Sequence, residues 1–264
     1  MAYTSFFRDT DAKIIHDDRF LESGYAEDNA AMAGRMEAAL EGLRPGPWEL
    51  LAPSPATPEQ LLLGHDAGYL QAVARDPARF AMASLAAGGA ILAARLAHGG
   101  EPAFACIRPP GHHAARDVAW GHCTFSNLAL ALLALRAEQR IDSAFVIDID
   151  AHTGDGTRKV LAGWPEVEIF NPFASDAASY LELVEARLRA IGQTGIMAVS
   201  AGFDAYVHDV GHKLETADFE RIGTLVRKAS LRACRGRRFA VLEGGYFLKD
   251  LGANVLAFCR GFAG

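Results

Sequence analysis

The sequence predicts an α/β fold in which a central, mostly parallel sheet is covered by helices on both faces. Short apolar runs alternate with longer Ala/Leu-rich segments, in which apolar residues recur three and four positions apart. This alternation is typical of strand–helix–strand units, which build parallel sheets. The expected strands are 103–107, 143–149, 167–170, 196–200 and 239–243. The expected helices are roughly 84–98, 125–139, 179–191, 216–234 and 249–262.

Length and composition favour one domain that spans residues 1–264. Half of the 264 residues are hydrophobic and 22% are charged, which is ordinary for a globular protein with a sizeable core. The sequence contains no internal repeat or long linker, and the Pro-rich stretch 45–58 reads as a loop around one strand at 48–52. Two domains divided there would leave an N-terminal piece with too little apolar content.

Charge and cysteine content argue against several classes of protein. The chain has 26 Lys+Arg and 32 Asp+Glu, a formal net charge of −6, whereas sequence-independent nucleic-acid binding needs a dense basic face. Its four cysteines include no C-x-x-C pair and form neither a disulfide framework nor a four-cysteine zinc site. Segment 1–18 is charged where a signal peptide is apolar, and no run reaches the roughly 18 apolar residues of a membrane span. We expect a cytoplasmic protein without nucleic-acid or membrane partners, and no pattern indicates its oligomeric state.

Four of the expected strands end in polar or ionisable residues. The segments concerned are 108–113, 148–152, 201–204 and 244–246. In open parallel sheets, ligands bind beyond the carboxyl ends of the strands. We therefore expect these four segments to meet at one edge of the sheet and to form the functional site.

Asp150, His152 and Asp204 are candidate metal ligands. Asp150 and His152 are two positions apart, so their side chains point the same way on an extended strand end. Three protein ligands with an open fourth position are the arrangement of a catalytic zinc site. The alternative is structural, with Asp150 and His152 at a helix N-terminus and Asp204 in a turn.

The tandem His112–His113 is a candidate for proton transfer. It follows Pro-Pro-Gly, a rigid turn, and one imidazole could take a proton from water and return it to a leaving amine. Asp148 and Asp155 are candidates for the carboxylate that orients such a base. The alternative is a histidine pair on the surface without a function.

Tyr246 is a candidate hydrogen-bond donor to a developing oxyanion. Gly244 and Gly245 precede it, and glycines allow a turn that brings the phenol back over the site. The alternative, a tyrosine that ends a strand against the core, is the commoner fate of a single tyrosine. The functional interpretation gains weight because Tyr246 shares one sheet edge with the other candidates.

Five motifs together resemble the zinc-dependent histone deacetylase family, which includes acetylpolyamine amidohydrolases and acetoin-utilisation proteins. They are RPPGHHA (108–114), GHCTFSNLALA (121–131), DIDAHTGDGT (148–157), SAGFDA (200–205) and EGGY (243–246). The resemblance is specific in order and spacing, and it covers most of the chain after the first fifty or so residues. It implies a three-layer α/β/α arginase/deacetylase fold. It also implies a hydrolase of linear amides that removes an acyl group, most often acetyl, from an amine such as acetyl-lysine or an acetylated polyamine.

The resemblance also implies the cofactor and the electrophilic residue. Zinc, one ion per chain, would be held by Asp150, His152 and Asp204. Tyr246 would polarise the acyl carbonyl. A structural potassium ion often lies near the residue that matches Asp148, but Glu168 stands here where the family usually has serine.

For proton transfer and the substrate pocket, the resemblance again implies particular residues. His113 would be the main general base and acid, and His112 its electrostatic partner. Asp155 would orient His113, and Asp148 would orient His112. The substrate pocket would be formed by Gly121, His122, Cys123, Gly244 and Gly245.

The sequence departs from the family pattern at the expected rim of the site. His122 replaces the usual Phe or Tyr of the acyl-lysine tunnel, and the segments 70–84 and 171–180 are much shorter than usual. We expect these short loops to leave a shallow, open site. The second metal ligands of arginase-type enzymes are absent around Asp204 and His152, so we expect a single metal ion.

Two alternatives to a deacetylase remain. An open rim would also suit an amidohydrolase that acts on a bulkier, non-acetyl small-molecule amide. A catalytically silent homologue could keep the pocket only to bind a ligand. Retention of all three candidate ligands, the histidine pair and Tyr246 argues against a silent homologue.

Overall fold

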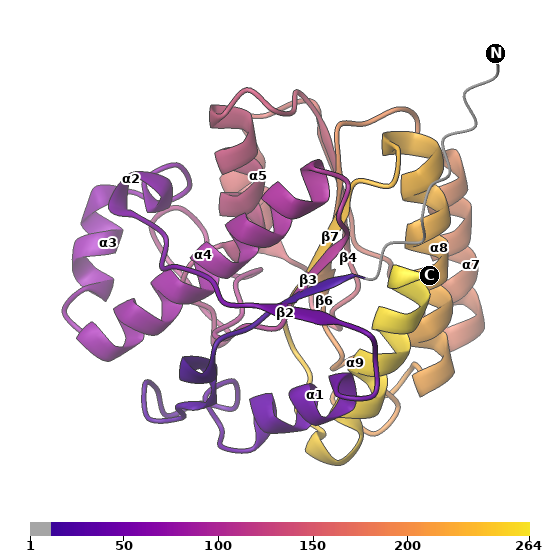
Figure 1. Cartoon of the computed structure of the whole chain (residues 1–264), viewed down its shortest axis with the longest axis horizontal. Coiled ribbons are helices and arrows are strands. Elements are labelled where there is room, and N and C mark those ends of the chain that lie inside the picture. Colours follow the sequence, from indigo (N-terminus) through magenta and orange to yellow (C-terminus); the bar gives the residue numbers. More distant parts are fainter. Residues whose placement is uncertain (1–11) are drawn as a thin grey trace.

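The structure, a computed structural model, describes residues 12–264. Most of segment 1–18, for which we expect no signal peptide, therefore lies outside the described residues. Within residues 12–264, seven parallel strands form one sheet in the order β2-β1-β3-β7-β6-β4-β5 (Figure 1). The strands are β1 (Lys13–Ile15), β2 (Glu49–Leu51), β3 (Ala103–Ala105), β4 (Ala144–Asp148), β5 (Val167–Phe170), β6 (Met197–Ala201) and β7 (Arg238–Leu242). The predicted parallel sheet is confirmed.

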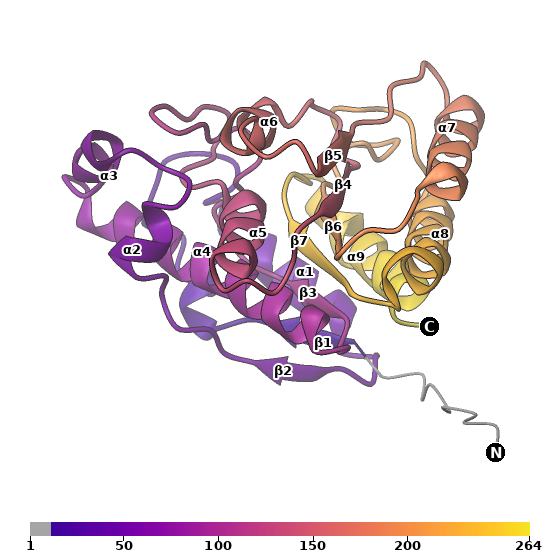
Figure 2. The ribbon, with the colours of Figure 1, turned by 90° about the horizontal axis from the view of Figure 1, so that it is seen from above.

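Helices cover both faces of this sheet (Figure 2). One layer is built on the packed pair α4 and α5, with α2 and α6 against α5 and α3 against α4; in the other, α9 packs against α1 and α8, and α7 against α8. Their bounds are α1 (Arg35–Leu43), α2 (Pro58–Leu61), α3 (Ala67–Val73), α4 (Pro77–His98), α5 (Asn127–Ala137), α6 (Asp155–Leu161), α7 (Ala177–Ala190), α8 (Thr216–Cys234) and α9 (Leu248–Ala263). This is the three-layer α/β/α architecture that the sequence predicts.

Two of the predicted elements agree with the structure residue for residue. The bounds of β5 and α8 agree with the predicted 167–170 and 216–234. The predicted start of α4 at residue 84 was wrong, because Asp76 accepts a hydrogen bond from the Arg79 N–H and Pro77 occupies the first turn. The three-residue strand β1 was missed, since a run this short gives no periodic signal.

Helix α4 forms much of the apolar core. Among the described residues it is the one helix long and apolar enough, by length and composition alone, to cross a membrane. We expected no such segment, and α4 reaches this length because it begins at Pro77. Of its apolar window, 72% is buried inside the structure, where α4 packs against β1, β3, β7 and α5. This burial is that of a core helix.

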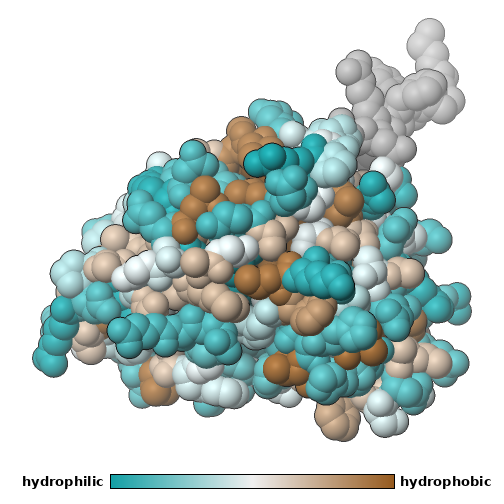
Figure 3. Space-filling view, turned by 90° about the horizontal axis from the view of Figure 1, so that it is seen from below, coloured by the Kyte–Doolittle hydropathy of each residue, from teal (hydrophilic) through white to brown (hydrophobic). Residues whose placement is uncertain are grey.

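The core lies between the sheet and the two helix layers. Every residue of β3, β4, β6 and β7 is buried, and burial of apolar surface is the main favourable term in folding. On the face shown in Figure 3, apolar residues form small groups among hydrophilic ones. That face is typical of a surface in contact with water.

The register of the central strands aligns their carboxyl ends. Ala105 pairs with Val241, Val241 with Ser200, and Ser200 with Asp148. Because β3, β7, β6 and β4 are parallel neighbours, the segments that follow them leave the sheet at one edge. The expected meeting of four strand ends is therefore confirmed.

Candidate active site

The three candidate metal ligands lie together beyond β4 and β6. One nitrogen or oxygen atom from each of Asp150, His152 and Asp204 lies within 4.8 Å of those of the other two. His152 Nδ1 is 3.0 Å from both Asp150 Oδ1 and Asp204 Oδ2. Both carboxylates are buried, whereas 49% of the His152 side chain is exposed. The structure thus brings together the predicted ligand set.

Backbone groups hold the two carboxylates in place. The Gly244 N–H donates to Asp150 Oδ2 at 2.9 Å, and the Ala151 N–H donates to Asp204 Oδ1 at 2.8 Å. A Cβ on Gly202 would lie 2.2 Å from Asp150 Oδ2. Only glycine therefore leaves room for the Asp150 carboxylate at this point.

The donor set fits a divalent cation. Asp204 Oδ2 is buried and, although it lies 3.0 Å from His152 Nδ1, it forms no hydrogen bond of acceptable geometry. Burial and then the charge of Asp150 raise the pKa of Asp204 to about 7. Two crowded, buried carboxylates are costly without a counter-charge, and a bound metal ion supplies it. Two carboxylates and one imidazole are ligands that zinc accepts.

The tandem histidines are each tied to one carboxylate. His112 Nδ1 lies 3.1 Å from Asp148 Oδ2, and His113 Nδ1 lies 2.9 Å from Asp155 Oδ1. Both pairings agree with the prediction from the family resemblance. When Nδ1–H donates to a carboxylate, Nε2 is the nitrogen that remains free to accept a proton.

The two histidines differ in their charge state. Burial would lower the pKa of His112, but the carboxylates of Asp150 and Asp148 raise it well above its ordinary value. Burial and then the charge of His112 lower the pKa of His113 to about 4. These shifts favour the charged form of His112 and the neutral form of His113.

Tyr246 is held beside the histidines by a buried arginine and an aspartate. The Arg35 guanidinium donates to the carbonyl oxygen of Gly245 at 2.9 Å and lies 5.3 Å from the centre of the Tyr246 ring. The Asp209 carboxylate accepts hydrogen bonds from the backbone N–H groups of Tyr246 and Phe247. Burial raises the pKa of Tyr246, so the phenol stays protonated and can donate a hydrogen bond.

The candidate site contains one cavity of about 200 Å³. Predicted residues in its lining are His112, His113, Gly121, His122, Asp150, His152 and Tyr246. Asn29, Pro110, Trp120 and Val210 also line it and were not predicted. Pro110 lies in the motif at 108–114, and Trp120 directly precedes the GHC motif.

Three of the predicted pocket residues support the cavity without lining it. Cys123 is buried, and its Sγ lies 3.4 Å from the His113 backbone N–H that donates to it. Gly244 binds Asp150 through its N–H, and Gly245 has its carbonyl oxygen on Arg35. The part of these three residues in the substrate pocket stays a prediction.

The site is open, as its short rim loops predict. Only residues 74–76 connect α3 to α4, and residues 171–176 connect β5 to α7. Beside the half-exposed His152, Trp120 is 53% exposed. Neither segment is long enough to cover the candidate metal ligands.

Glu243 is a functional candidate that the sequence analysis missed, although it begins the EGGY motif. Its buried carboxylate accepts hydrogen bonds from the N–H groups of Gly111 and His112 at 2.7 and 3.1 Å. Ser200 Oγ donates to its other oxygen at 3.3 Å. Glu243 thus joins β6 and β7 to the histidine turn. Arg35 was missed because it lies in the N-terminal region, which matched no motif.

The expected potassium ion receives no support from the structure. Asp148 Oδ2 lies against His112 Nδ1, and Asp148 Oδ1 accepts the Asp150 N–H. Glu168, at the position where the family usually has serine, pairs with Arg187. These carboxylates are engaged within the protein.

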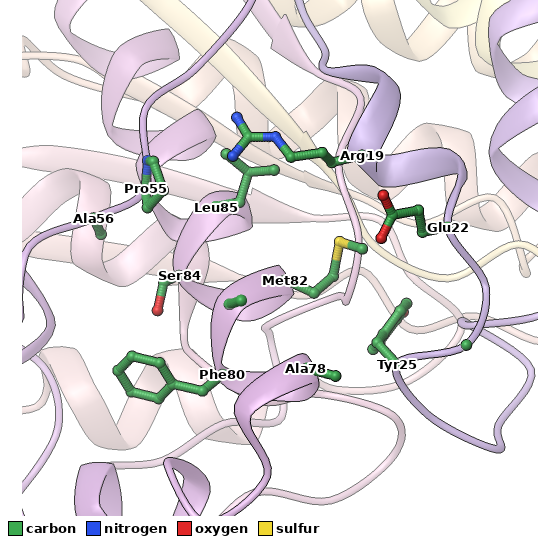
Figure 4. Close-up of a pocket in the computed structure, with 12 residues that line it drawn as sticks. Arg19, Glu22, Tyr25, Pro55, Ala56, Ala78, Phe80, Met82, Ser84 and Leu85 are labelled. Atoms are coloured by element: carbon green, nitrogen blue, oxygen red, sulfur yellow. The ribbon is translucent and has the colours of Figure 1, made fainter.

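A larger cavity, of about 620 Å³, lies elsewhere, between α4 and the segment after β1 (Figure 4). Phe80, Met82 and Leu85 of α4 line it together with Tyr25, and Arg19 and Glu22 are its charged residues. It contains no histidine, cysteine or aspartate. Its chemistry suits an apolar ligand better than hydrolysis, so the smaller cavity is the candidate active site.

The fold agrees with that of a solved deacetylase domain. The crystal structure of the HDA15 HD domain matches with a TM-score of 0.82, covering 96% of this chain and 90% of that one. The two sequences are 21% identical, so this likeness shows the fold alone. It confirms the arginase/deacetylase architecture that the five motifs imply.

The sequence comparisons identify the family. Residues 29–180, more than half of the chain, match the family model of the histone deacetylase domain. The chain therefore belongs to the histone deacetylase family. It is 29% identical over 206 residues to acetylpolyamine amidohydrolase 2 of Pseudomonas aeruginosa, covering 64% of this chain and 58% of that protein. It is 30% identical over 225 residues to a probable deacetylase of Methanothermobacter thermautotrophicus, covering 71% and 66%. The chain thus spans about three fifths to two thirds of the length of these relatives.

Proposed function

We propose that this chain is a zinc-dependent amidohydrolase that removes an acyl group, in the first place acetyl, from an amine. The observation that carries the proposal is one cavity of about 200 Å³ lined by the histidine pair, Tyr246 and two metal-ligand candidates, Asp150 and His152, with the third candidate, Asp204, beside those two. A cavity this small suits an acetyl group better than a bulky acyl group. Amide hydrolysis needs a base for water, an acid for the amine and a donor for the oxyanion.

Zinc would be held by Asp150, His152 and Asp204, one ion per chain. When bound, zinc supplies a Lewis acid that makes water more acidic and polarises a carbonyl group. The crowded carboxylates, with the unpaired Asp204 Oδ2, support this assignment.

His113 is the proposed general base and general acid. Because its Nδ1 is held by Asp155, Nε2 is the nitrogen of this cavity-lining residue that remains free to accept a proton. Nε2 takes a proton from the attacking water and then gives it to the nitrogen of the leaving amine. The depressed pKa of His113 keeps it neutral, and ready to accept a proton, at neutral pH.

His112 and Tyr246 are proposed to stabilise the negative charge on the former carbonyl oxygen. His112, whose Nδ1 lies 3.1 Å from the Asp148 carboxylate, contributes positive charge beside that oxygen when it is protonated. The Tyr246 hydroxyl donates a hydrogen bond to that oxygen, and Arg35 holds the Tyr246 loop in position. Preorganised donors of this kind act without reorganisation during the reaction.

The substrate is proposed to be an acylated amine: an acetylated polyamine, whose remaining amines are cationic, or acetyl-lysine in a peptide. One relative is named for acetylpolyamines. His122 in the cavity wall lies 3.8 Å from the Asp28 carboxylate, and the chain carries a net charge of −6. The net negative charge favours the approach of a positively charged amine.

A substrate panel tests this proposal. Zinc-loaded protein is assayed for amine release from acetyl-lysine peptides, acetylpolyamines and amides with bulkier acyl groups, with His113→Ala as the control for contaminating hydrolases. We expect hydrolysis of acetylated amines and none by the control. Hydrolysis of only the bulkier amides would favour the second candidate function, which the open rim supports. A chain with one zinc ion that hydrolyses none of them would be a silent binding homologue.

A further inference from the structure

Trp120 contacts both members of the His113–Asp155 pair. Its ring is stacked on the His113 imidazole, with 3.6 Å between ring centroids and 28° between planes. Its indole Nε1–H donates to Asp155 Oδ1 at 3.1 Å. That same oxygen lies 2.9 Å from His113 Nδ1. One side chain thus touches the proposed base and the carboxylate that orients it.

The His113 ring is in contact with the rings of both Trp120 and His112. The His112 and His113 ring centroids are 4.0 Å apart, with 41° between planes. His113 is therefore restrained by two neighbouring rings and by a carboxylate at Nδ1. His113 and Trp120 line the cavity together, and Nε2 is the ring nitrogen that the carboxylate leaves free.

The chain fixes Trp120 in this place through the residues that follow it. Gly121 has φ +59°, and a Cβ there would lie 2.6 Å from His113 Cδ2. The Cys123 N–H closes the turn by donating to the Trp120 carbonyl oxygen at 3.1 Å. A close turn that requires glycine at position 121 therefore holds the Trp120 indole in contact with the His113 ring.

Asp155 needs such support more than Asp148 does. The Asp155 side chain is 31% exposed, whereas that of Asp148 is 2% exposed. Water competes for an exposed carboxylate, so its orientation depends on the protein groups that hold it. Lys159 Nζ holds Oδ2 at 2.9 Å, and Trp120 supplies the partner on the side of His113.

We propose that Trp120 is a positioning residue of the reaction, which acts by holding the Asp155 carboxylate against His113 Nδ1. This inference rests on the proposed function of His113 as the base. The indole N–H fixes the Asp155 oxygen that accepts the hydrogen bond from His113 Nδ1–H. The proton therefore stays on Nδ1, and Nε2 remains the basic nitrogen. The indole face prevents the imidazole from rotating away. A base must lie within hydrogen-bond reach of the proton that it takes, so both effects act on the rate of the chemical step.

The first test replaces Trp120 by Phe, which keeps an aromatic ring but removes the N–H donor. We expect kcat to fall about tenfold, as for other groups that orient a catalytic side chain, and KM to change less than about twofold. The matched control is Trp48→Phe. Among the described residues Trp48 Nε1 has no hydrogen-bond partner, and Trp48 precedes β2, away from the carboxyl ends of the strands that carry the site. A rise in KM with unchanged kcat would show that Trp120 only contributes to substrate binding, and would overturn the inference.

The second test asks whether Trp120 acts through Asp155. Trp120→Phe is combined with Asp155→Ala, and the loss in kcat is compared in the two backgrounds. We expect the tenfold loss in kcat to disappear in the Asp155→Ala background, so that the ratio of the two kcat values approaches one. An equal loss in both backgrounds would contradict action through Asp155. Because the wild-type chain is active in either case, this failure would leave the proposed function intact.

The third test does not depend on activity. The indole N–H resonances of the three tryptophans are recorded by NMR, and that of Trp120 is assigned from its loss in Trp120→Phe. We expect Asp155→Ala to move this resonance upfield and to leave those of Trp48 and Trp164 in place. A Trp120 resonance that does not respond to Asp155→Ala would disprove the hydrogen bond on which the inference rests.

Discussion

Glu243 Oε2 accepts a hydrogen bond from the backbone N–H of His112 at 3.1 Å and so ties the end of β7 to the histidine turn. The Gly111 N–H donates to the same oxygen at 2.7 Å. All three groups are buried, so no water can replace the carboxylate if it is removed.

Replacement of Glu243 by Ala is expected to destabilise the fold. Two buried N–H groups would lose their acceptor, and each such loss costs about 1–3 kcal/mol. We expect the free energy of unfolding in urea to fall by about 2–5 kcal/mol. The control is Glu182→Ala, an exposed position on α7, with an expected change within about 0.5 kcal/mol. Equal unfolding midpoints for Glu243→Ala and the wild type would contradict this role.

Replacement of His113 by Ala or of Tyr246 by Phe is expected to lower the rate without removing the metal. Loss of a general base or of an oxyanion donor typically costs two to four orders of magnitude, so kcat should fall by roughly that factor. Neither residue belongs to the candidate ligand set, so zinc content should stay at one per chain. Near wild-type turnover in either variant would refute the assigned role.

Replacement of Asp204 by Ala is expected to abolish zinc binding. It removes one of three ligands and the buried oxygen that has no hydrogen bond. Zinc per chain is measured by elemental analysis after dialysis against a weak chelator. The control is His208→Ala, an exposed histidine four residues further along the same loop, which should retain one zinc. If Asp204→Ala retained zinc as tightly as the control, the ligand set would be wrong.

His65 is expected to make stability depend on pH. Burial lowers its pKa to about 4 from its ordinary value of 6.5, so between these values the unfolded chain binds a proton that the folded chain does not. Its contribution is complete above pH 6.5 and is lost as the pH falls toward 4, by up to about 3 kcal/mol. His65→Gln keeps an acceptor for the Ser126 N–H but does not titrate. The stability difference between wild type and variant should therefore shrink on acidification, and a constant difference would exclude His65 as the cause.

The sequence predicted the fold and the polar sheet edge well, for a physical reason. Parallel strands buried on both faces produce apolar runs, and their carboxyl ends must share an edge. Asp150, His152 and Asp204 could therefore be grouped before any coordinates were known. Their contacts with the catalytic candidates follow from the register of β4 and β6.

The supporting residues could not be predicted in the same way. Arg35 reaches Gly245 across 210 positions of sequence, and no local pattern indicates such a pairing. Trp120 lies in an irregular turn, whose course depends on the positive φ of Gly121. The sequence predicts Glu243 only as the last residue of a strand. Its supporting role could not be predicted, because its partners are backbone N–H groups, which no sequence motif reveals.

The most direct test of metal-dependent deacylation is a removal and restoration assay. Amine release from an N-acetylated diamine is measured for the protein as isolated, after exhaustive chelation, and after addition of one equivalent of zinc. The account predicts that hydrolysis is lost on chelation, returns with one zinc per chain, and does not return in Asp204→Ala. Hydrolysis that persists at full rate in the metal-free wild-type protein would contradict it.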